Sequence, residues 1–295
     1  MSKILLIANP KSGVKSNKSI LGLVINEFER NSIEFTLNFT EHSGHAINIV
    51  KNFNFSEYST VCAVGGDGTL NEVLNGMLTR SDQRKVPIGL IPGGTGNSFM
   101  KTMDLLDPFE AILKIINNEP RTVDVMKAKG SDGVYFSLNL VGWGMATDIS
   151  IVAEKLRILG GQRYNIASVI EIIRNKKRPA RLIIDDVETT NDFCFIIACN
   201  TKYVGKGMKM APGAIIDDGL IDLIVVKKNS RSTLLSVFPK LFDGGHVSHP
   251  ACEYLKCKTF SIKPEQNEPL NIDGEIIGFA PVDVELIENG IDLLV

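Results

Sequence analysis

Apolar residues in the first part of the chain, up to residue 122, fall into two alternating patterns. Short apolar runs bounded by glycine or polar residues are typical of buried strands, and stretches with apolar residues every three or four positions are typical of helices. The expected strands are residues 3–8, 35–40, 61–64 and 88–91. The expected helices are residues 19–30, 45–53, 70–79 and 108–117. This alternation predicts a mostly parallel sheet with helices on both faces, which is an α/β domain.

From residue 123 onward the pattern changes to alternating runs separated by turn residues. An Asp or Asn followed by Gly favours the two-residue turn of a β-hairpin. Four such pairs are Asp132-Gly133, Asp218-Gly219, Asp273-Gly274 and Asn289-Gly290. One helix is expected at residues 149–176. We therefore predict an α/β domain over residues 1–122 and a β-rich, largely antiparallel domain over residues 123–295. The final strand either stays in the second domain or returns to the first.

The composition limits the classes of partner. The 295 residues include 32 Lys and Arg against 34 Asp and Glu, a formal net charge of −2, which argues against nucleic acid binding through bulk charge. The longest apolar runs, such as residues 193–199, fall far short of the roughly 20 residues that span a bilayer, and residues 4–8 are too short for a signal peptide. We therefore expect a cytoplasmic protein. The five cysteines are odd in number and never spaced C-x-x-C, which argues against a disulfide framework.

The stretch from residue 61 to 72, VCAVGGDGTLNE, carries the most informative chemistry. An apolar strand runs into glycines that let a ligand approach the backbone closely. Thr69 followed three residues later by Glu72 is a capping-box pattern, so a helix is expected to begin at once and to direct N–H groups towards an anion. Asp67 beside such an anion site favours Mg²⁺ bridging nucleotide phosphates. The alternative is a tight turn in which Asp67 is solvated.

Two similar turns follow other predicted strands. Residues 9–13, NPKSG, follow the first strand, and residues 92–98, PGGTGNS, follow the strand at 88–91. Loops at the carboxyl ends of parallel strands converge on one crevice, so three phosphate-compatible loops predict a nucleotide site. Residues 9–13 alone are equally an ordinary exposed turn. The chain lacks G-x-x-x-x-G-K-[ST], a G-x-G-x-x-G after a strand, and the H-R-D and D-F-G pair. This argues against P-loop, dinucleotide-binding and protein-kinase folds.

In this order and spacing, the three motifs resemble those of the diacylglycerol kinase catalytic-domain family, which includes sphingosine and ceramide kinases and soluble bacterial lipid kinases. The resemblance continues through residues 217–222, DDGLID, and 271–275, NIDGE, and so covers nearly the whole chain. It implies a first domain similar to the phosphofructokinase and NAD kinase nucleotide fold, an antiparallel β-sandwich as second domain, and an active site in the cleft between them. It also implies a Mg²⁺-dependent kinase that transfers the γ-phosphate of ATP to a lipid hydroxyl. Diacylglycerol is the first expectation for the acceptor, with phosphatidic acid as product.

The resemblance also implies roles for individual residues. Contacts to ATP are implied for Asn9, Pro10, Lys11, Ser12, Gly13, Thr40, Gly65, Gly66, Asp67, Gly68, Thr69, Leu70, Asn71, Glu72 and Thr95. An alcohol acceptor must lose its proton as the O–P bond forms, so a carboxylate within hydrogen-bond reach is required. We assign this role to Glu275, with Asp273 two residues before it, and expect Asp67 to organise Mg²⁺. Asp67 is the competing candidate for the base. Without the resemblance, Asp273-Gly274 would indicate a hairpin turn, and Asp273 and Glu275 would be two surface acids.

A second, structural Mg²⁺ site is implied at Asp217, Asp218 and the carbonyl of Leu220. Oxygen ligands at this spacing suit a hard cation, although an acidic hairpin turn explains them almost equally well. Ser98 stands where many bacterial relatives have an acid, which puts in doubt any role of that acid in this chain.

The expected partner is a lipid substrate at the membrane surface, so we expect the protein to be cytoplasmic and peripheral to the membrane. A homodimer is compatible with the sequence. Residues 174–181, RNKKRPAR, hold the only concentrated basic stretch, which is either a solvated helix end or a contact to anionic lipid worth about 1 kcal/mol per charge. Two other functions stay open: a kinase of a sphingoid base or of a soluble acceptor such as NAD, and a nucleotide-binding regulator without turnover.

Overall fold

The computed structural model describes residues 3–10, 17–94, 97–205 and 207–295, and the chain forms two compact units. The first unit comprises Met1–Val125 together with Glu288–Val295, and the second comprises Met126–Ile287. Two strands, β5 (Arg121–Gly130) and β15 (Val282–Leu294), carry the chain from one unit into the other. The last residues of β15 therefore belong to the unit that contains the N-terminal strands.

The first unit is built on a parallel sheet with strand order β2-β1-β3-β4, to which the end of β15 adds in parallel beside β4. The strands are β1 (Lys3–Ala8), β2 (Phe35–Phe39), β3 (Tyr58–Gly65) and β4 (Ile88–Pro92). The helices are α1 (Asn17–Arg30), α2 (His45–Asn52), α3 (Asp67–Leu78), α4 (Ser98–Thr102) and α5 (Pro108–Asn117). The predicted α/β alternation and the parallel sheet are confirmed.

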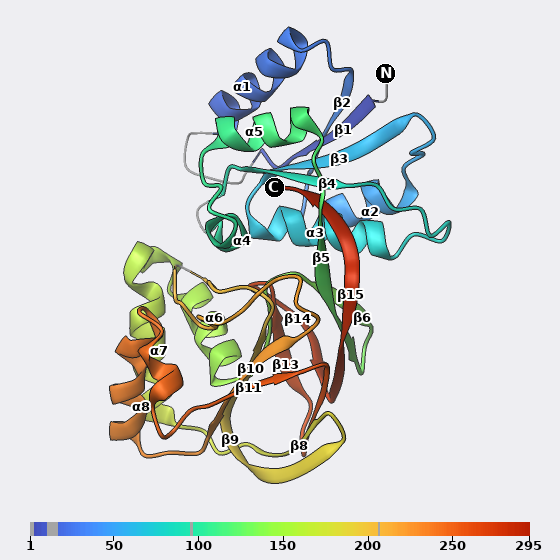
Figure 1. Ribbon diagram of the computed structural model, residues 1–295. Helices are drawn as coiled ribbons and strands as arrows, with labels where there is room; N and C mark the ends of the chain where they lie inside the picture. Colours follow the sequence, from blue (N-terminus) through green and yellow to red (C-terminus); the bar gives the residue numbers. More distant parts are fainter. Residues whose placement is uncertain (1–2, 11–16, 95–96, 206) are drawn as a thin grey trace. The chain divides into compact units, whose positions relative to one another are not determined.

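Helices cover both faces of this sheet, because side chains along a strand point alternately to opposite sides. On β1, Ile4, Leu6 and Ala8 pack in one core with residues of α1 and α5. Leu5 and Ile7 are also fully buried, on the face that α2 and α3 cover. Figure 1 shows α1 and α5 on one side of the strands and α2 and α3 on the other. All four strands therefore end at the same carboxyl edge.

The second unit is mostly antiparallel, as predicted. Its strands after β5 are β6 (Val134–Ser137), β7 (Leu140–Gly144), β8 (Pro179–Ile184), β9 (Val187–Cys199), β10 (Ile221–Lys227), β11 (Glu253–Cys257), β12 (Thr259–Pro264), β13 (Glu268–Ile272) and β14 (Glu275–Ala280). The long strand β9 belongs to two sheets: its first half pairs with β8 and its second half with β7 and β10. Residues from both sheets, including Trp143 and Phe260, form one buried core.

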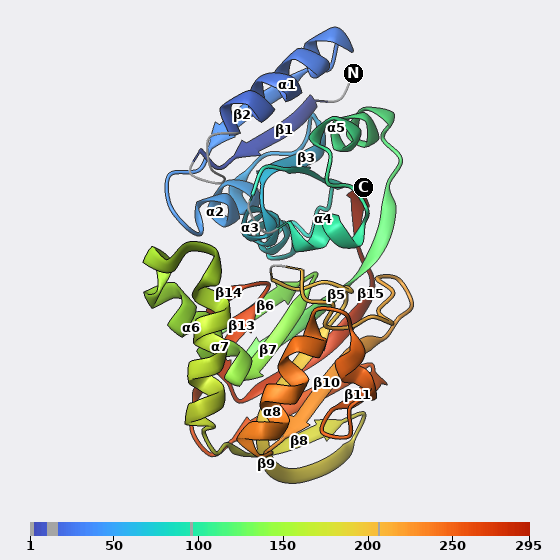
Figure 2. The ribbon, with the colours of Figure 1, turned by 90° about the vertical axis from the view of Figure 1, so that its left-hand side faces the viewer.

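Helices of the second unit cover the other face of β9. They are α6 (Met145–Lys155), α7 (Arg163–Arg174) and α8 (Arg231–Val237), with the 3₁₀ helices η1 (Arg157–Gln162), η2 (Phe238–Leu241) and η3 (Gly245–Ser248). Ile196 and Ala198 of β9 face the sandwich core, whereas Phe195 and Ile197 pack with the helices. Figure 2 shows α6, α7 and α8 together with β10 behind α8. Among the described residues, no helix is long and apolar enough to cross a membrane.

Two local predictions for the second half were wrong. The single helix expected at 149–176 is two helices, because the chain turns at Gly160, whose φ of 56° no α-helix accommodates. Asp132-Gly133 and Asp273-Gly274 join paired strands as predicted. Asp218-Gly219 instead lies in the long connection before β10, and Asn289-Gly290 lies inside β15, where the Asn289 N–H donates to Asp124 Oδ1 at 2.8 Å.

Candidate functional site

Among the described residues, Asn9 and Thr40, which the sequence assigned to a nucleotide, lie at the carboxyl edge of the first unit. The backbone N–H of Asn9 donates to Val64 O at 3.3 Å, and that of Thr40 donates to Ala8 O at 2.9 Å. The ends of β1, β2 and β3 therefore lie next to one another. Lys11, Ser12, Gly13 and Thr95 lie outside the described residues, and Pro10 is exposed at the edge of that gap.

The glycine loops after β3 and β4 touch each other. The Gly93 N–H donates to Gly65 O at 2.7 Å, and a methyl group built on Gly94 would lie 2.5 Å from the Cα of Gly66. A methyl group on Gly65 would lie 2.4 Å from Thr69 Oγ1. Only glycine permits such close approach, so the two loops form one backbone surface at the start of α3.

Asp67 joins this surface to a third element. It is the first residue of α3, and its carboxylate accepts hydrogen bonds from the backbone N–H groups of Ser98, at 2.7 Å, and Phe99, at 3.1 Å. Asp67 thus caps the N-terminus of α4, a role that the sequence analysis missed. A carboxylate has about four acceptor positions, and these bonds use two of them.

The capping box predicted for Thr69 and Glu72 is wrong. Helix α3 begins at Asp67 with Gly66 as N-cap and no side-chain cap, so Glu72 lies in the second turn, beyond reach of the helix start. Its carboxylate instead accepts from the N–H groups of Gly44, at 2.8 Å, and Ala46, at 3.0 Å, in the first turn of α2. Glu72 therefore fixes α2 against α3. Thr69, Leu70 and Asn71 are buried in α3, and Gly68 is half-buried.

In the second unit, Asp273 is an anchor for the neighbouring loop. Its carboxylate accepts from Ser137 Oγ at 2.5 Å and from three successive backbone N–H groups. These are the N–H groups of Leu138, Asn139 and Leu140, at 3.1, 2.9 and 2.9 Å. Asp273 and Gly274 both have positive φ, of 51° and 96°, as a type I′ hairpin turn requires. Glu275, the first residue of β14, is exposed directly after this turn.

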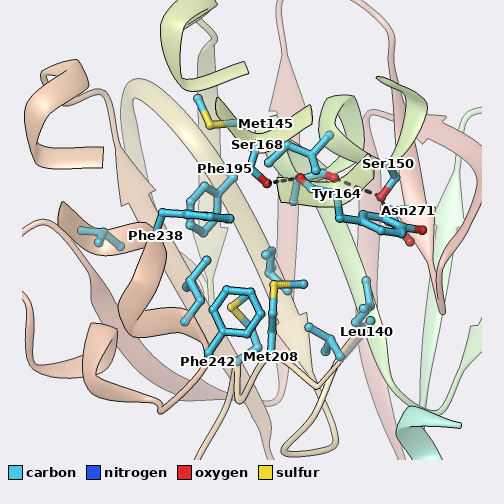
Figure 3. Close-up of a pocket in the computed structure, with 18 of the residues that line it drawn as sticks. Leu140, Met145, Ser150, Tyr164, Ser168, Phe195, Met208, Phe238, Phe242 and Asn271 are labelled. Atoms are coloured by element: carbon cyan, nitrogen blue, oxygen red, sulfur yellow. Dashed lines mark hydrogen bonds between the residues drawn. The ribbon is translucent and has the colours of Figure 1, made fainter. Parts of the chain in front are cut away.

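An apolar pocket of about 290 Å³ lies beside this turn, between β9 and the helical layer. Figure 3 shows side chains from strands and helices directed into it, with Ser150 and Asn271 together at one side. Its apolar wall includes Met145, Ile149, Ile172, Phe195, Ile197, Met208, Leu234 and Phe238. Asn271 and Gly274 also line it, so the pocket reaches the turn that carries Glu275.

The polar groups of the pocket are hydrogen-bonded to one another and to the turn. Asn271 Nδ2 donates to Ser150 Oγ at 2.9 Å, and Asn271 Oδ1 accepts from the Gly274 N–H at 2.9 Å. Ser168 Oγ donates to Tyr164 O at 2.8 Å. The sequence motifs did not indicate this pocket. Its clearest local signal is the group of methionines at 145, 208 and 210, since Met adapts to irregular apolar cavities.

Of the residues assigned to a structural Mg²⁺ site, Asp218 pairs with a lysine. Lys256 Nζ lies 2.6 Å from Asp218 Oδ2 and 3.9 Å from Asp222 Oδ2. Burial raises the pKa of the Asp222 carboxyl above its usual range, and the hydrogen bond from the Tyr254 hydroxyl opposes this shift. The Leu220 N–H donates to Asp218 Oδ1 at 3.1 Å, and Asp217 is exposed. Within the described ranges, no three His, Cys, Asp or Glu side chains are grouped closely enough to hold a metal ion.

Comparison with known proteins agrees with both units. Residues 3–128 match the diacylglycerol kinase catalytic domain, and residues 139–295 match the YegS C-terminal NAD kinase beta sandwich-like domain. Diacylglycerol kinase of Bacillus subtilis (strain 168) is 31% identical over 95% of this chain and 92% of its own length. Sphingosine kinase 1 of Arabidopsis thaliana is 29% identical over 93% of this chain and 68% of its own length. The crystal structure of a diacylglycerol kinase from Bacillus anthracis str. Sterne has the same fold, with a TM-score of 0.81 and 24% identity over 99% of this chain and 96% of that one.

A parallel α/β unit with a glycine-rich carboxyl edge, followed by a β-sandwich unit with an apolar pocket, is the architecture of a lipid kinase. The chain belongs to the diacylglycerol kinase catalytic-domain family. The resemblance that rested on the glycine-rich motifs is thereby confirmed, as are the two fold classes.

Proposed function

We propose that the protein transfers the γ-phosphoryl group of ATP to the hydroxyl group of diacylglycerol, giving phosphatidic acid. The observation that carries the proposal is the apolar pocket, whose wall ends in Asn271 and Gly274 of the turn before Glu275. A ligand with an apolar tail gains from filling such a pocket, and its polar end is then held next to the hydrogen-bonded groups of the turn. A soluble acceptor such as NAD has no tail to place there.

The donor site of this proposal is the carboxyl edge of the first unit. Backbone N–H groups at glycine loops and at the start of a helix bind phosphate groups without any side-chain charge. The contact between Gly66 and Gly94 holds two of these loops in one arrangement. When Mg²⁺ is bound, it neutralises charge on the transferred group, and Asp67 is the residue that would hold it.

The proton of the acceptor hydroxyl passes to Glu275 in this proposal. As the acceptor oxygen bonds to the γ-phosphorus, the bond between that phosphorus and the β,γ-bridging oxygen breaks and ADP leaves. Glu275 is favoured over Asp273 because the Asp273 carboxylate already accepts four hydrogen bonds, whereas Glu275 is exposed directly after Gly274, which lines the pocket. Asp273 positions the turn, and Asp67 is the competing base.

The acceptor can be tested by measuring ADP formation with a panel of alcohols. Diacylglycerol, a sphingoid base and undecaprenol would each be presented in detergent, and NAD would be presented with and without detergent. Turnover that requires diacylglycerol supports the proposal. Turnover on NAD alone contradicts it, and no turnover on any acceptor favours a nucleotide-binding regulator.

A sphingoid base is the second candidate acceptor. Its support is the similarity to Arabidopsis sphingosine kinase 1, which covers 93% of this chain. Both acceptors place an apolar tail in the pocket, so the ratio of their kcat/KM values is the quantity that separates them.

A further inference from the structure

One amide side chain is buried in the wall of the apolar pocket. Asn271 of β13 is 7% exposed and lines the pocket together with Ser150 of α6. Figure 3 shows the two side chains next to each other at one side of the pocket. Burying an amide costs free energy unless its hydrogen bonds are made. The partners of Asn271 therefore show which of its hydrogen bonds are left for a ligand.

The orientation of the Asn271 amide follows from these partners. The Gly274 N–H can only donate, so the side-chain atom 2.9 Å from it is the oxygen, Oδ1. Nδ2 therefore faces Ser150, whose Oγ accepts one of its two N–H groups at 2.9 Å. The Ser150 hydroxyl in turn donates to Ala146 O at 3.3 Å. Within the described ranges, the second N–H of Asn271 has no acceptor, so it is available to an oxygen atom of a ligand in the pocket.

The pocket has no charged side chain that could neutralise an ionic ligand. Among the described residues that line it, none is Asp, Glu, Lys, Arg or His. The polar side chains of its wall are those of Ser150, Tyr164, Asn165, Ser168 and Asn271. Moving an ammonium or carboxylate group into such surroundings costs far more free energy than moving a neutral polar group. The pocket therefore favours an uncharged ligand.

An uncharged oxygen that accepts a hydrogen bond fits both features of the pocket. The ester carbonyl of an acylglycerol is such a group, since it accepts hydrogen bonds and carries no charge. The ammonium group of a sphingoid base has the opposite properties, because it only donates and is positively charged. The two candidate acceptors therefore differ in the group that they present to Asn271.

We propose that Asn271 donates a hydrogen bond to an ester carbonyl of the acceptor and so selects an acylglycerol over a sphingoid base. This inference rests on the proposed lipid-kinase function, because it names the group by which the pocket recognises the acceptor. In a diacylglycerol the free hydroxyl lies on the carbon next to an ester. A carbonyl bound to Asn271 therefore keeps the hydroxyl near the turn that Asn271 holds through the Gly274 N–H, directly before Glu275.

Matched ligands test the contact in the unaltered protein. Dioctanoylglycerol has two ester carbonyls, and its ether analogue dioctylglycerol has tails of the same length and the same hydroxyl group without them. Calorimetric titration without ATP should give a Kd about tenfold lower for the ester, as expected for one hydrogen bond. N-acetylsphingosine, which has a carbonyl and no charge, should bind at least about tenfold more tightly than sphingosine. Equal Kd values within either pair overturn the proposal.

Asn271→Asp tests the residue itself. The substitution keeps an oxygen that accepts from the Gly274 N–H and replaces the donor with an acceptor. The preference for ester over ether should disappear. The Kd for sphingosine divided by that for dioctanoylglycerol should fall at least about tenfold, because a carboxylate attracts an ammonium group and repels a carbonyl oxygen. Burial raises the pKa of a carboxyl group, so the titrations are made near pH 8 to keep the new group ionised.

The matched control is Asn191→Asp, the same exchange at an exposed position of β9. Asn191 Oδ1 accepts from the Asp192 N–H at 2.9 Å, which a carboxylate also does, so every ratio of Kd values should stay as in the wild type. A purely structural role of Asn271 in the turn predicts that Asn271→Asp alters ester and ether binding equally. An ester preference that persists in Asn271→Asp, or that Asn191→Asp also removes, overturns the proposal.

The two proposals fail in different ways. The titrations are made without ATP and do not depend on turnover. An ester preference that Asn271→Asp removes therefore supports carbonyl recognition even when no acceptor is phosphorylated. Turnover of diacylglycerol together with equal Kd values for ester and ether leaves the proposed lipid-kinase function in place and overturns only the role of Asn271.

Discussion

The two units differ in the part of the chain that they offer to a ligand. The first unit offers backbone: its glycine loops touch through Gly66 and Gly94, and no side chain separates them. The second unit offers side chains: its pocket is lined by residues from position 140 to position 274. A phosphate is recognised by N–H groups in a fixed arrangement, whereas an apolar tail needs only volume of the right shape. One unit is therefore sensitive to the addition of a single methyl group, and the other tolerates exchange of one apolar residue for another.

The largest effect is expected where the second unit supplies a charge. Glu275→Gln should lower kcat about 10²- to 10⁴-fold, because the amide cannot accept the proton of the acceptor hydroxyl. The affinity for ATP and the midpoint of thermal unfolding should not change, since Glu275 is exposed at the start of β14. Steady-state turnover and calorimetric titration with ATP measure these quantities.

Glu265→Gln, an exposed acid between β12 and β13, is the matched control and should retain full turnover. Near-normal turnover of Glu275→Gln would show that Glu275 is not the base. A loss in Asp67→Asn with ATP binding retained would then place the base at the glycine edge.

A single methyl group tests the backbone surface of the first unit. Gly94→Ala would bring a Cβ within 2.5 Å of the Gly66 Cα, and backbone has no rotamer with which to relieve that contact. We expect a loss of about 1–3 kcal/mol in the free energy of unfolding and weaker ATP binding, measured by denaturant titration and calorimetry.

The control for this substitution is Gly22→Ala in α1, where nothing lies within 4 Å of the added methyl group. There the free energy of unfolding should stay constant or rise by up to about 1 kcal/mol. Equal effects of the two alanines would contradict the idea that the glycine loops must touch.

Filling the pocket tests the second unit in the complementary way. Ala146→Phe places a ring into the pocket from α6, so KM for a long-chain acceptor should rise about tenfold while KM for ATP stays unchanged. Leu235→Phe adds a ring on the exposed side of α8, outside the pocket, and should change neither constant. Equal KM values for long-chain acceptor in Ala146→Phe and wild type would show that the tail binds elsewhere.

The same difference explains which features could be predicted from the sequence. Helix α5 (Pro108–Asn117) has the expected bounds because its start is encoded locally: Pro108 is the first residue and Asp107 accepts from the Phe109 N–H at 2.8 Å. The glycine loops were equally visible, since close backbone approach leaves glycine as the only choice. In both cases the residues that determine the local structure lie within the segment itself.

Features that depend on residues far apart in the sequence could not be predicted from it. Glu72 caps a helix 26 residues earlier in the chain, and its own sequence neighbourhood instead suggested a cap for α3. The pocket draws single residues from several elements, and each of them alone is an ordinary core residue. The exposed apolar residues of α7, Ile166, Val169 and Ile173, have helical spacing as well, so only the fold decides which side of the helix meets solvent.

The smallest effect is expected for Lys256 and its neighbours Asp218 and Asp222. A substitution of Lys256 tests whether its ammonium group takes the place of a bound metal ion. The Lys256 ammonium lies between Asp218 and Asp222, where a bound cation would also reduce the repulsion of the two carboxylates. Lys256 and Asp218 are both partly exposed, so the loss of their ion pair in Lys256→Met should cost about 1 kcal/mol or less in the free energy of unfolding without metal. Mg²⁺ should then raise the melting temperature of Lys256→Met more than that of the wild type or of Lys256→Arg, because lysine and metal compete for Asp218. An equal rise in all three proteins would show that Mg²⁺ binds without displacing Lys256, and no rise in any of them would mean that the lysine and its two carboxylates form a site without metal.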